Sequence, residues 1–139
     1  MKKALMLCLV VMMSVVFTGL ALAYNEIGTN TYLGEYAGNA GGGSSNSSFG
    51  YNAGASLTGI GYMNTFMGGH AGASNTTGYR NTFIGYQSGY YNTTGDFNNF
   101  IGYQAGLGQY TQSTGNDNNI IGYQAGYANT TGNSNNFMV

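Results

Sequence analysis

The sequence NTFIGYQSGYYNTTG, residues 81–95, is one of several near copies that follow one another along the chain. NTFMGGHAGASNTTG (64–78) precedes it, and NNFIGYQAGLGQYTQSTG (98–115) and NNIIGYQAGYANTTG (118–132) follow it. When the glycine of FIG is taken as the reference position, the copies align with spacings of 16 to 20 residues. The reference positions are Gly34, Gly50, Gly68, Gly85, Gly102, Gly122 and, in a seventh copy, Val139. Residues 24–139 are therefore interpreted as a single repeat domain.

Every copy carries an asparagine four residues before the reference position. This column consists of Asn30, Asn46, Asn64, Asn81, Asn98, Asn118 and Asn135. Side chains of stacked asparagines can hydrogen-bond to one another along a ladder in repetitive β structure. We therefore expect a structural asparagine ladder rather than a repeated binding motif.

The repeat unit predicts β structure. NTFIG combines a threonine, an aromatic residue and a β-branched residue before a glycine, which is typical of a short strand. AG and NTTG are turn sequences, and the frequent glycines and lack of a 3.6-residue period exclude a helix. A strand–turn–strand–turn unit predicts an all-β fold, a β-solenoid or β-roll of about seven coils of 16–20 residues. We expect surface loops where GGGSSNSS (41–48) and LGQYTQ (107–112) depart from the unit.

Residues 1–23 have the features of a cleaved signal peptide. Two lysines are followed by an apolar run and then by Ala-Leu-Ala, the small residues that a signal peptidase recognises. The alternative is a retained membrane anchor, but the apolar run is short for a membrane span. We expect a secreted or cell-surface protein that begins at Tyr24 and has no membrane span after cleavage.

The composition of residues 24–139 excludes several function classes. One strong base, Arg80, stands against four acids, so no basic patch is available for nucleic-acid binding. The only cysteine lies in the signal peptide, which leaves no disulfide. The single histidine, His70, and the scattered acids form neither a metal site nor a nucleophile–base pair. We therefore predict no enzymatic activity, no metal and no cofactor.

Both residues before the reference position are apolar in most copies, for example Phe83 and Ile84. Neighbouring residues of a strand face opposite sides, so one face fills the coil and the other needs a cover. The simplest cover is the same strand of another chain, which predicts a homo-oligomer, with a trimer as one simple closure. The alternative is a single solenoid with an exposed apolar stripe. The residues assigned to the assembly interface are Phe66, Phe83, Phe100, Ile120, Phe137, Met138 and Val139.

NTFIGYQAG, the pattern of these units, resembles the NSVAIG core of the head repeat of YadA-like trimeric autotransporter adhesins, and is similar to repeats in phage-type tail fibres. The resemblance covers the repeat region and implies a trimer of β-coils that is exported and displayed or assembled outside the cell. It also implies binding to host matrix or glycans, or a role as a spacer. The coiled-coil stalk and membrane anchor of the adhesins are not found in this sequence.

A second column supplies the candidate binding surface. Tyrosine follows the reference position in four copies, and glutamine follows three of these tyrosines. Rows of aromatic rings and amides suit the recognition of sugar faces, although simple packing within the ladder is the alternative explanation. The residues are Tyr51, Tyr86, Tyr103, Tyr123, Gln87, Gln104 and Gln124.

The sequence thus supports two main hypotheses of function. The first is a secreted structural subunit of an extracellular fibre, which self-assembles through stacked β-coils and open terminal strands. The second is an adhesin-like or lectin-like module that binds glycans or matrix. Rows of paired threonines raise a third hypothesis, ice binding, which the irregular unit lengths disfavour.

Overall fold

The computed structural model describes residues 29–41, 43–109 and 113–139. The predicted signal peptide at 1–23 therefore lies outside the described residues, as do parts of the two irregular loops. Within the described residues the chain is all-β and contains no helix.

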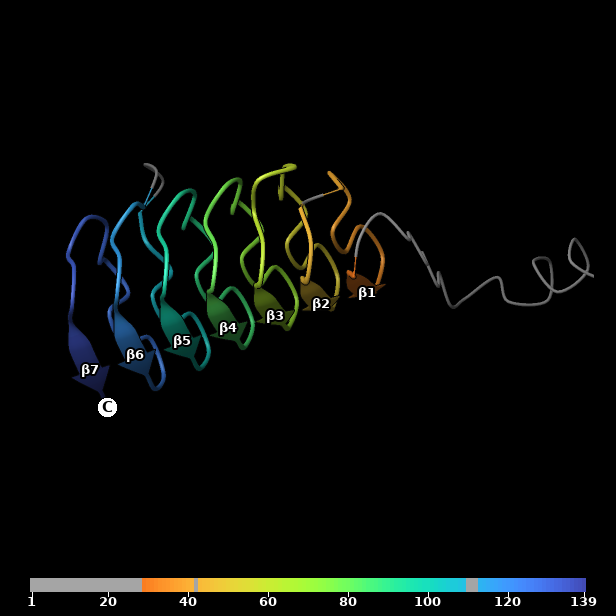
Figure 1. The fold of residues 1–139 in the computed structure, drawn as a ribbon. Coiled ribbons are helices and arrows are strands. Elements are labelled where there is room, and N and C mark those ends of the chain that lie inside the picture. Colours follow the sequence, from red (N-terminus) through yellow and green to blue (C-terminus); the bar gives the residue numbers. More distant parts are fainter. Residues whose placement is uncertain (1–28, 42, 110–112) are drawn as a thin grey trace, which may run out of the picture.

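Seven three-residue strands form one parallel sheet in sequence order (Figure 1). They are β1 (Thr31–Leu33), β2 (Ser47–Phe49), β3 (Thr65–Met67), β4 (Thr82–Ile84), β5 (Asn99–Ile101), β6 (Asn119–Ile121) and β7 (Asn136–Met138). Equivalent residues of successive copies are paired, for example Phe66 with Phe83 and Phe83 with Phe100. The predicted β-solenoid is confirmed, and each predicted NTFIG strand is present.

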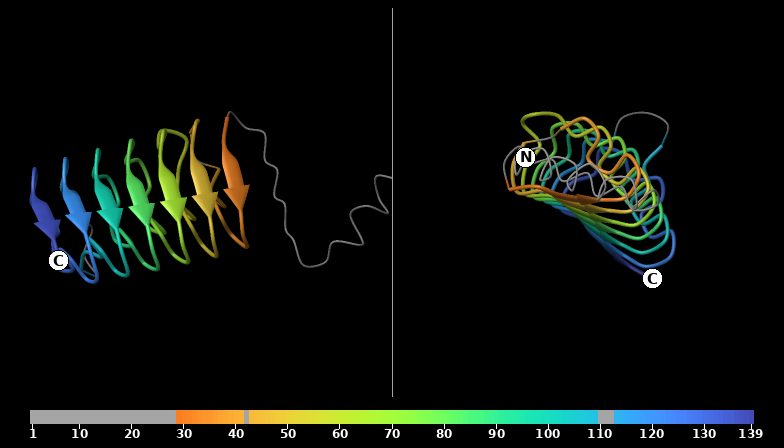
Figure 2. Two further views of the ribbon diagram at one scale, coloured as in Figure 1. Left: turned by 90° about the horizontal axis from the view of Figure 1, so that it is seen from below. Right: turned by 90° about the vertical axis from the view of Figure 1, so that its right-hand side faces the viewer.

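The chain makes one turn of the solenoid between successive strands, and the view along the axis shows the turns superimposed (Figure 2). Backbone hydrogen bonds join the turns as well as the strands. The glycine that follows each alanine donates to the next coil, as in Gly54 N–H to Ala71 C=O (2.9 Å) and Gly72 N–H to Ser88 C=O (2.9 Å). The turns are therefore stacked in register, like the sheet.

The prediction of two strands per coil was wrong. The second half of each coil consists of turns, with only an isolated parallel bridge between Asn92 and Ser113 in the described residues. The reason is the backbone conformation: in the coil of β4, for example, Gln87 and Gly89 both have positive φ, +55° and +59°. Left-handed residues at such short intervals prevent an extended segment.

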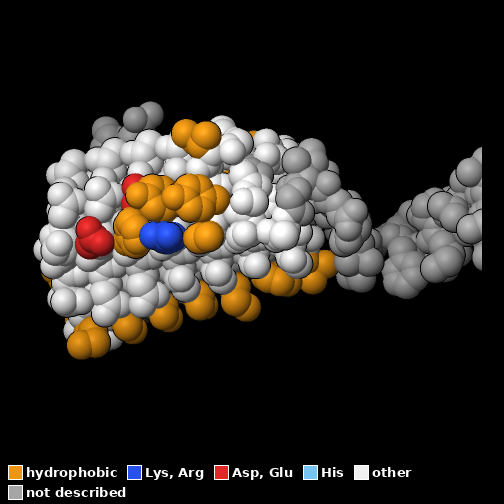
Figure 3. Space-filling view, viewed as in Figure 1, with side chains coloured by type: hydrophobic (Ala, Val, Ile, Leu, Met, Phe, Trp, Pro, Cys, Tyr) orange, Lys and Arg blue, Asp and Glu red, His pale blue; other side chains and the backbone are white. Residues whose placement is uncertain are grey.

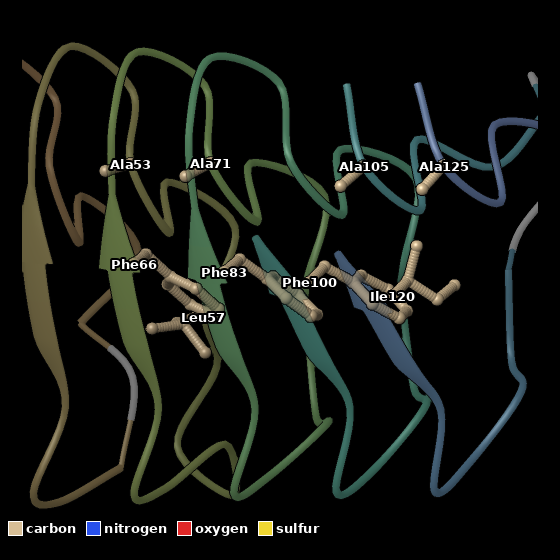
Figure 4. Close-up of a cluster of buried hydrophobic side chains, with 9 residues drawn as sticks. All are labelled: Ala53, Leu57, Phe66, Ala71, Phe83, Phe100, Ala105, Ile120 and Ala125. Atoms are coloured by element: carbon tan, nitrogen blue, oxygen red, sulfur yellow. The ribbon is translucent and has the colours of Figure 1, made fainter. Parts of the chain in front are cut away.

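The middle residue of each of the strands β1 to β6 is buried inside the coil. Phe66, Phe83 and Ile120 have no exposed surface, and Phe100 is 4% exposed. The rings stack along the axis, with ring-centre distances of 5.3 Å from Phe66 to Phe83 and 4.8 Å from Phe83 to Phe100. Alanines of the opposite wall, such as Ala71 and Ala105, close the interior (Figure 4). The core is thus one side chain thick and as long as the solenoid.

Such a thin core explains the glycine that follows the alanine, or in one coil Ser88, on the opposite wall. Gly89 has φ +59°, and a Cβ placed on it would lie 2.6 Å from the ring of Phe83. Gly106 stands in the same relation to Phe100, at 2.5 Å. The aromatic ring of the strand residue occupies the space that a residue larger than glycine would need. The glycine of the opposite wall is therefore required by the ring that it faces.

This arrangement corrects part of the predicted assembly interface. Phe66, Phe83, Phe100 and Ile120 are buried within one chain, so they are not available to a second chain. The outward-facing residues are their neighbours at the third strand position. These are Leu33, Phe49, Met67, Ile84, Ile101, Ile121 and Met138, which we call the outer stripe. Of the predicted interface residues, Phe137, Met138 and Val139 are exposed, at 41%, 74% and 87%.

Candidate functional site

The asparagine column forms a continuous hydrogen-bonded ladder along the inside of one corner. From Asn30 to Asn135, each side-chain oxygen accepts the backbone N–H of the next asparagine, at 2.8–3.0 Å. The side-chain amide of each of the first six donates to a glycine carbonyl of the next coil, at 2.6–2.9 Å. Five of the seven are buried, at 0–1% exposure. Every coil is therefore joined to the next by the same two bonds, and the buried amides have no donors or acceptors directed to solvent.

The tyrosine column lies on the surface. Tyr86, Tyr103 and Tyr123 stack in sequence, with ring-centre distances of 5.7 and 5.3 Å and interplanar angles of 18° and 8°. Their exposed fractions are 47%, 43% and 69%. Tyr51 is also exposed but is separated from this stack by the coil of Gly69, where the histidine ring of His70 contacts both Tyr51 and Tyr86. The structure thus gives His70 an aromatic packing position.

The glutamines that follow the tyrosines form an amide ladder. Gln104 donates to Gln87 at 2.7 Å, and Gln124 donates to Gln104 at 2.9 Å. All three have positive φ, between +51° and +55°. A hollow of about 390 Å³ lies beside this ladder, and the described residues that line it are Gln87, Tyr90, Tyr91, Gln104, Leu107, Gly108, Gln109 and Tyr127. The predicted tyrosine and glutamine residues are therefore brought together on one accessible surface.

The outer stripe is a second accessible feature. Leu33, Met67 and Met138 are exposed at 38%, 44% and 74%, and the four stripe residues between them are partly exposed. A row of hydrophobic side chains follows the edge of the molecule where the strands lie (Figure 3). The stripe is apolar in every coil and uncovered in the single chain.

A third feature was missed by the sequence reasoning. The two residues before each ladder asparagine are small or polar in the coils at both ends, for example Asn116 and Asp117. In each of three middle coils, at least one of the two is instead a large residue. We call these residues the side patch: Tyr62, Met63, Tyr79, Arg80, Asp96 and Phe97. The departure from the column pattern was a signal available in the sequence, but the contacts arise only when the coils stack.

The side patch is an aromatic cluster around one cation. The rings of Tyr62 and Tyr79 are stacked at 4.8 Å, and Tyr79 meets Phe97 edge-on at 5.2 Å. The guanidinium carbon of Arg80 lies 5.3 Å from the ring centre of Phe97 and 6.0 Å from that of Tyr79. These are cation–π distances. In Figure 3, hydrophobic side chains surround a basic group on the side of the coil, with acidic groups beside them.

Asp96 is held in this cluster by the backbone. Its side-chain oxygen accepts the Tyr79 N–H at 2.9 Å, and its own N–H donates to the side chain of Asn116 at 2.7 Å. Partial burial raises the pKa of Asp96; the Tyr79 bond opposes this, and the nearby charge of Asp117 adds to it. The side chain of Asp96 thus accepts a backbone N–H of the preceding coil. Asn116 and Asn133, at the same position of the following coils, do the same.

The described residues contain no cluster of three or more histidine, cysteine or acidic side chains that could hold a metal ion. In the same part of the chain, no helix has the length and hydropathy to cross a membrane.

The first threonine of several NTTG-type turns donates its hydroxyl to the next coil, as in Thr76 to Thr93 C=O at 3.0 Å.

The fold and these surfaces define a β-solenoid protein with exposed aromatic and apolar rows. Comparison of the chain with protein families, with characterised proteins and with solved structures found no match.

Proposed function

We propose that this protein is a secreted structural subunit of an extracellular fibre, which assembles by self-association of its coils. The observation that supports the proposal most directly is the outer stripe. A sheet face that is apolar in all seven coils leaves a long hydrophobic surface in contact with water, and such surfaces mark interaction sites.

The regularity of the stripe favours a second copy of the same chain as its partner. Met67, Ile84 and Ile101 occupy equivalent positions in consecutive coils, so the stripe repeats once per coil and can meet the same repeat in another copy. Two or three parallel solenoids that bury their stripes against each other satisfy this geometry, and a trimer closes the arrangement around one axis.

Elongation would use the same contacts that already join the coils. Each coil presents to the next a strand edge and an asparagine, with the same register throughout. A coil of another chain with this register would extend both the sheet and the ladder. Together, lateral association and stacking give a rod with a uniform cross-section.

The stripe can be tested with the mature chain, residues 24–139. We expect native mass spectrometry to show a homo-oligomer, and electron microscopy to show rods. The double variant Ile84→Glu/Ile101→Glu should be monomeric with an unchanged circular dichroism spectrum, because two charges on each stripe oppose its burial.

The matched control is Thr94→Glu/Thr114→Glu, which adds the same charge at exposed positions away from the strands. This control should assemble like the unmodified protein. A wild-type chain that stays monomeric at every concentration would contradict the proposal.

The second candidate function is glycan or matrix binding by the tyrosine and glutamine rows. It is favoured by the stack of exposed rings at Tyr86, Tyr103 and Tyr123 beside a hollow bordered by the glutamine amides. A discrete oligomer that forms no rods but is retained on immobilised glycans would favour this function over the first.

A further inference from the structure

The side patch places large residues at positions before the ladder asparagine where other coils have small residues. At the position directly before the ladder asparagine, the coils at both ends use Ser45, Asp117 and Ser134. The three middle coils use Met63, Arg80 and Phe97. The asparagine ladder and the parallel strand pairing continue through all of these coils, so they do not require the large residues.

The large residues also occupy an unfavourable backbone conformation. Met63, Arg80 and Phe97 have φ of +56°, +56° and +57°. The left-handed conformation costs an ordinary residue roughly 1–2 kcal/mol, and asparagine, aspartate and glycine tolerate it best. Met63, Arg80 and Phe97 therefore each carry a conformational free-energy cost. In the neighbouring coil, where Asp117 occupies the same position, this cost is smaller. Residues held in this way frequently mark functional sites.

The exposed surfaces of the patch are suited to a ligand. Met63 and Phe97 are exposed at 50% and 43%, and Arg80 is exposed as well. Within the described residues Arg80 forms no ion pair, so its guanidinium is fixed by the rings of Phe97 and Tyr79 alone. The result is an aromatic platform built from rings at different angles, with hydrogen-bond donors at its centre.

The charge of the patch narrows the class of ligand. Arg80 is the only lysine or arginine of the described residues, and the carboxylates of Asp96 and Asp117 lie on the same side of the coil. One cation against two carboxylates disfavours an anionic ligand, while donors and acceptors are both present. A neutral sugar matches both properties, because its C–H face packs on aromatic rings and its hydroxyls accept from guanidinium and donate to carboxylate.

We propose that the side patch is a binding site for a neutral oligosaccharide, centred on Arg80 and Phe97. Sugar rings lie on the platform of Tyr62, Tyr79 and Phe97, and Arg80 donates to ring or hydroxyl oxygens. The patch is separate from the outer stripe (Figure 3), so the site remains accessible when stripes associate. It is also separate from the tyrosine column that follows the reference glycines.

The test is titration of the mature protein with cellohexaose, chitohexaose, xylohexaose and mannohexaose, followed by calorimetry and by aromatic NMR signals. Hyaluronan is the anionic probe. We expect at least one neutral hexasaccharide to bind and to shift the Phe97 and Tyr79 signals. Arg80→Asn and Phe97→Asn should each weaken that binding about tenfold, which corresponds to about 1.4 kcal/mol.

Asparagine is chosen because it suits the left-handed conformation, so both variants should fold and unfold at a temperature no lower than the wild type. Tyr36→Asn is the control, since it removes an exposed ring outside the side patch at a residue with the same left-handed conformation, φ +58°. It should leave binding unchanged. Tyr123→Asn reports on the tyrosine column instead. The proposal is overturned if no neutral hexasaccharide binds, if hyaluronan alone binds, or if Tyr123→Asn abolishes binding that the patch variants retain. None of these outcomes alters the oligomeric state, which tests the proposed fibre separately.

Discussion

The coils of β2 and β4 have equivalent strand and turn positions, but the large side chain that fills the interior comes from the strand in one coil and from the turn in the other. In the coil of β4 the strand supplies Phe83 and the opposite turn supplies the polar Asn92. In the coil of β2 the strand supplies the small Ser48, and the turn position equivalent to Asn92 holds Leu57. All four side chains are buried, at 0–1% exposure. The comparison teaches that each coil has a limited interior volume, which a large residue from either wall can fill.

The two solutions differ in their polar groups. Asn92 donates its amide to the carbonyl of Gly95 at 3.0 Å, whereas the hydroxyl of Ser48 is buried and has no hydrogen-bond partner. The phenylalanine coils also form the ring stack, which the serine coil interrupts. We therefore expect the coil of β4, which has both the ring stack and a hydrogen-bonded turn asparagine, to be more stable than the coil of β2.

The largest effect is expected when the coil of β4 receives the serine of β2. Phe83→Ser should lower the free energy of unfolding by about 3–5 kcal/mol, because it leaves a cavity between two stacked rings. Urea denaturation monitored by circular dichroism would measure the loss.

The double variant Phe83→Ser/Asn92→Leu gives the coil of β4 both interior residues of the β2 coil, a serine on the strand and a leucine in the turn. It should recover at least about 1 kcal/mol relative to the single variant, because neighbouring changes that share a volume are not additive. If the double variant is less stable than Phe83→Ser, the interiors of the two coils are not equivalent.

An intermediate effect is expected from glycine substitutions in the same two coils. Gly89→Ala should cost about 2–4 kcal/mol, because the new Cβ meets the Phe83 ring at 2.6 Å and φ is +59°. Gly59→Ala is the matched control, since no atom lies within 4 Å of its Cβ and its φ is not in the left-handed region. This control should change stability by less than about 0.5 kcal/mol. Equal losses in thermal denaturation would refute the thin-core interpretation.

The smallest effect is expected at the buried hydroxyls. Ser48→Ala removes a hydroxyl without a partner and should raise the free energy of unfolding by up to about 1 kcal/mol. Ser88→Ala removes a hydroxyl that donates to Phe100 C=O at 2.9 Å and should lower stability by a similar amount. Shifts of the same sign in urea midpoints would show that the bonding of these hydroxyls does not decide their contribution.

Much of the fold could be predicted from the columns of the repeat. The strand at TFI, the register between copies and the stacking of the asparagines all follow from residues that recur at one position. The second strand was predicted wrongly because the side chains there do not reveal left-handed φ at residues such as Gln87. The side patch was missed because its columns vary from coil to coil, so no recurring residue marks them.

The sequence by itself determined the period, the strand positions and the parallel stacking of equivalent residues, because a repeat of one length must place like residues one above another. Only the tertiary structure decided which apolar strand residue points inward. Phe83 and Ile84 are both apolar, and alternation alone does not say which of them faces the alanine–glycine wall. The glycine four residues after the reference position decides which residue faces inward. Glycine has no Cβ, so only the strand residue opposite this glycine has room for an aromatic ring. The same folding brought Tyr79, Arg80 and Phe97 from two coils into one patch.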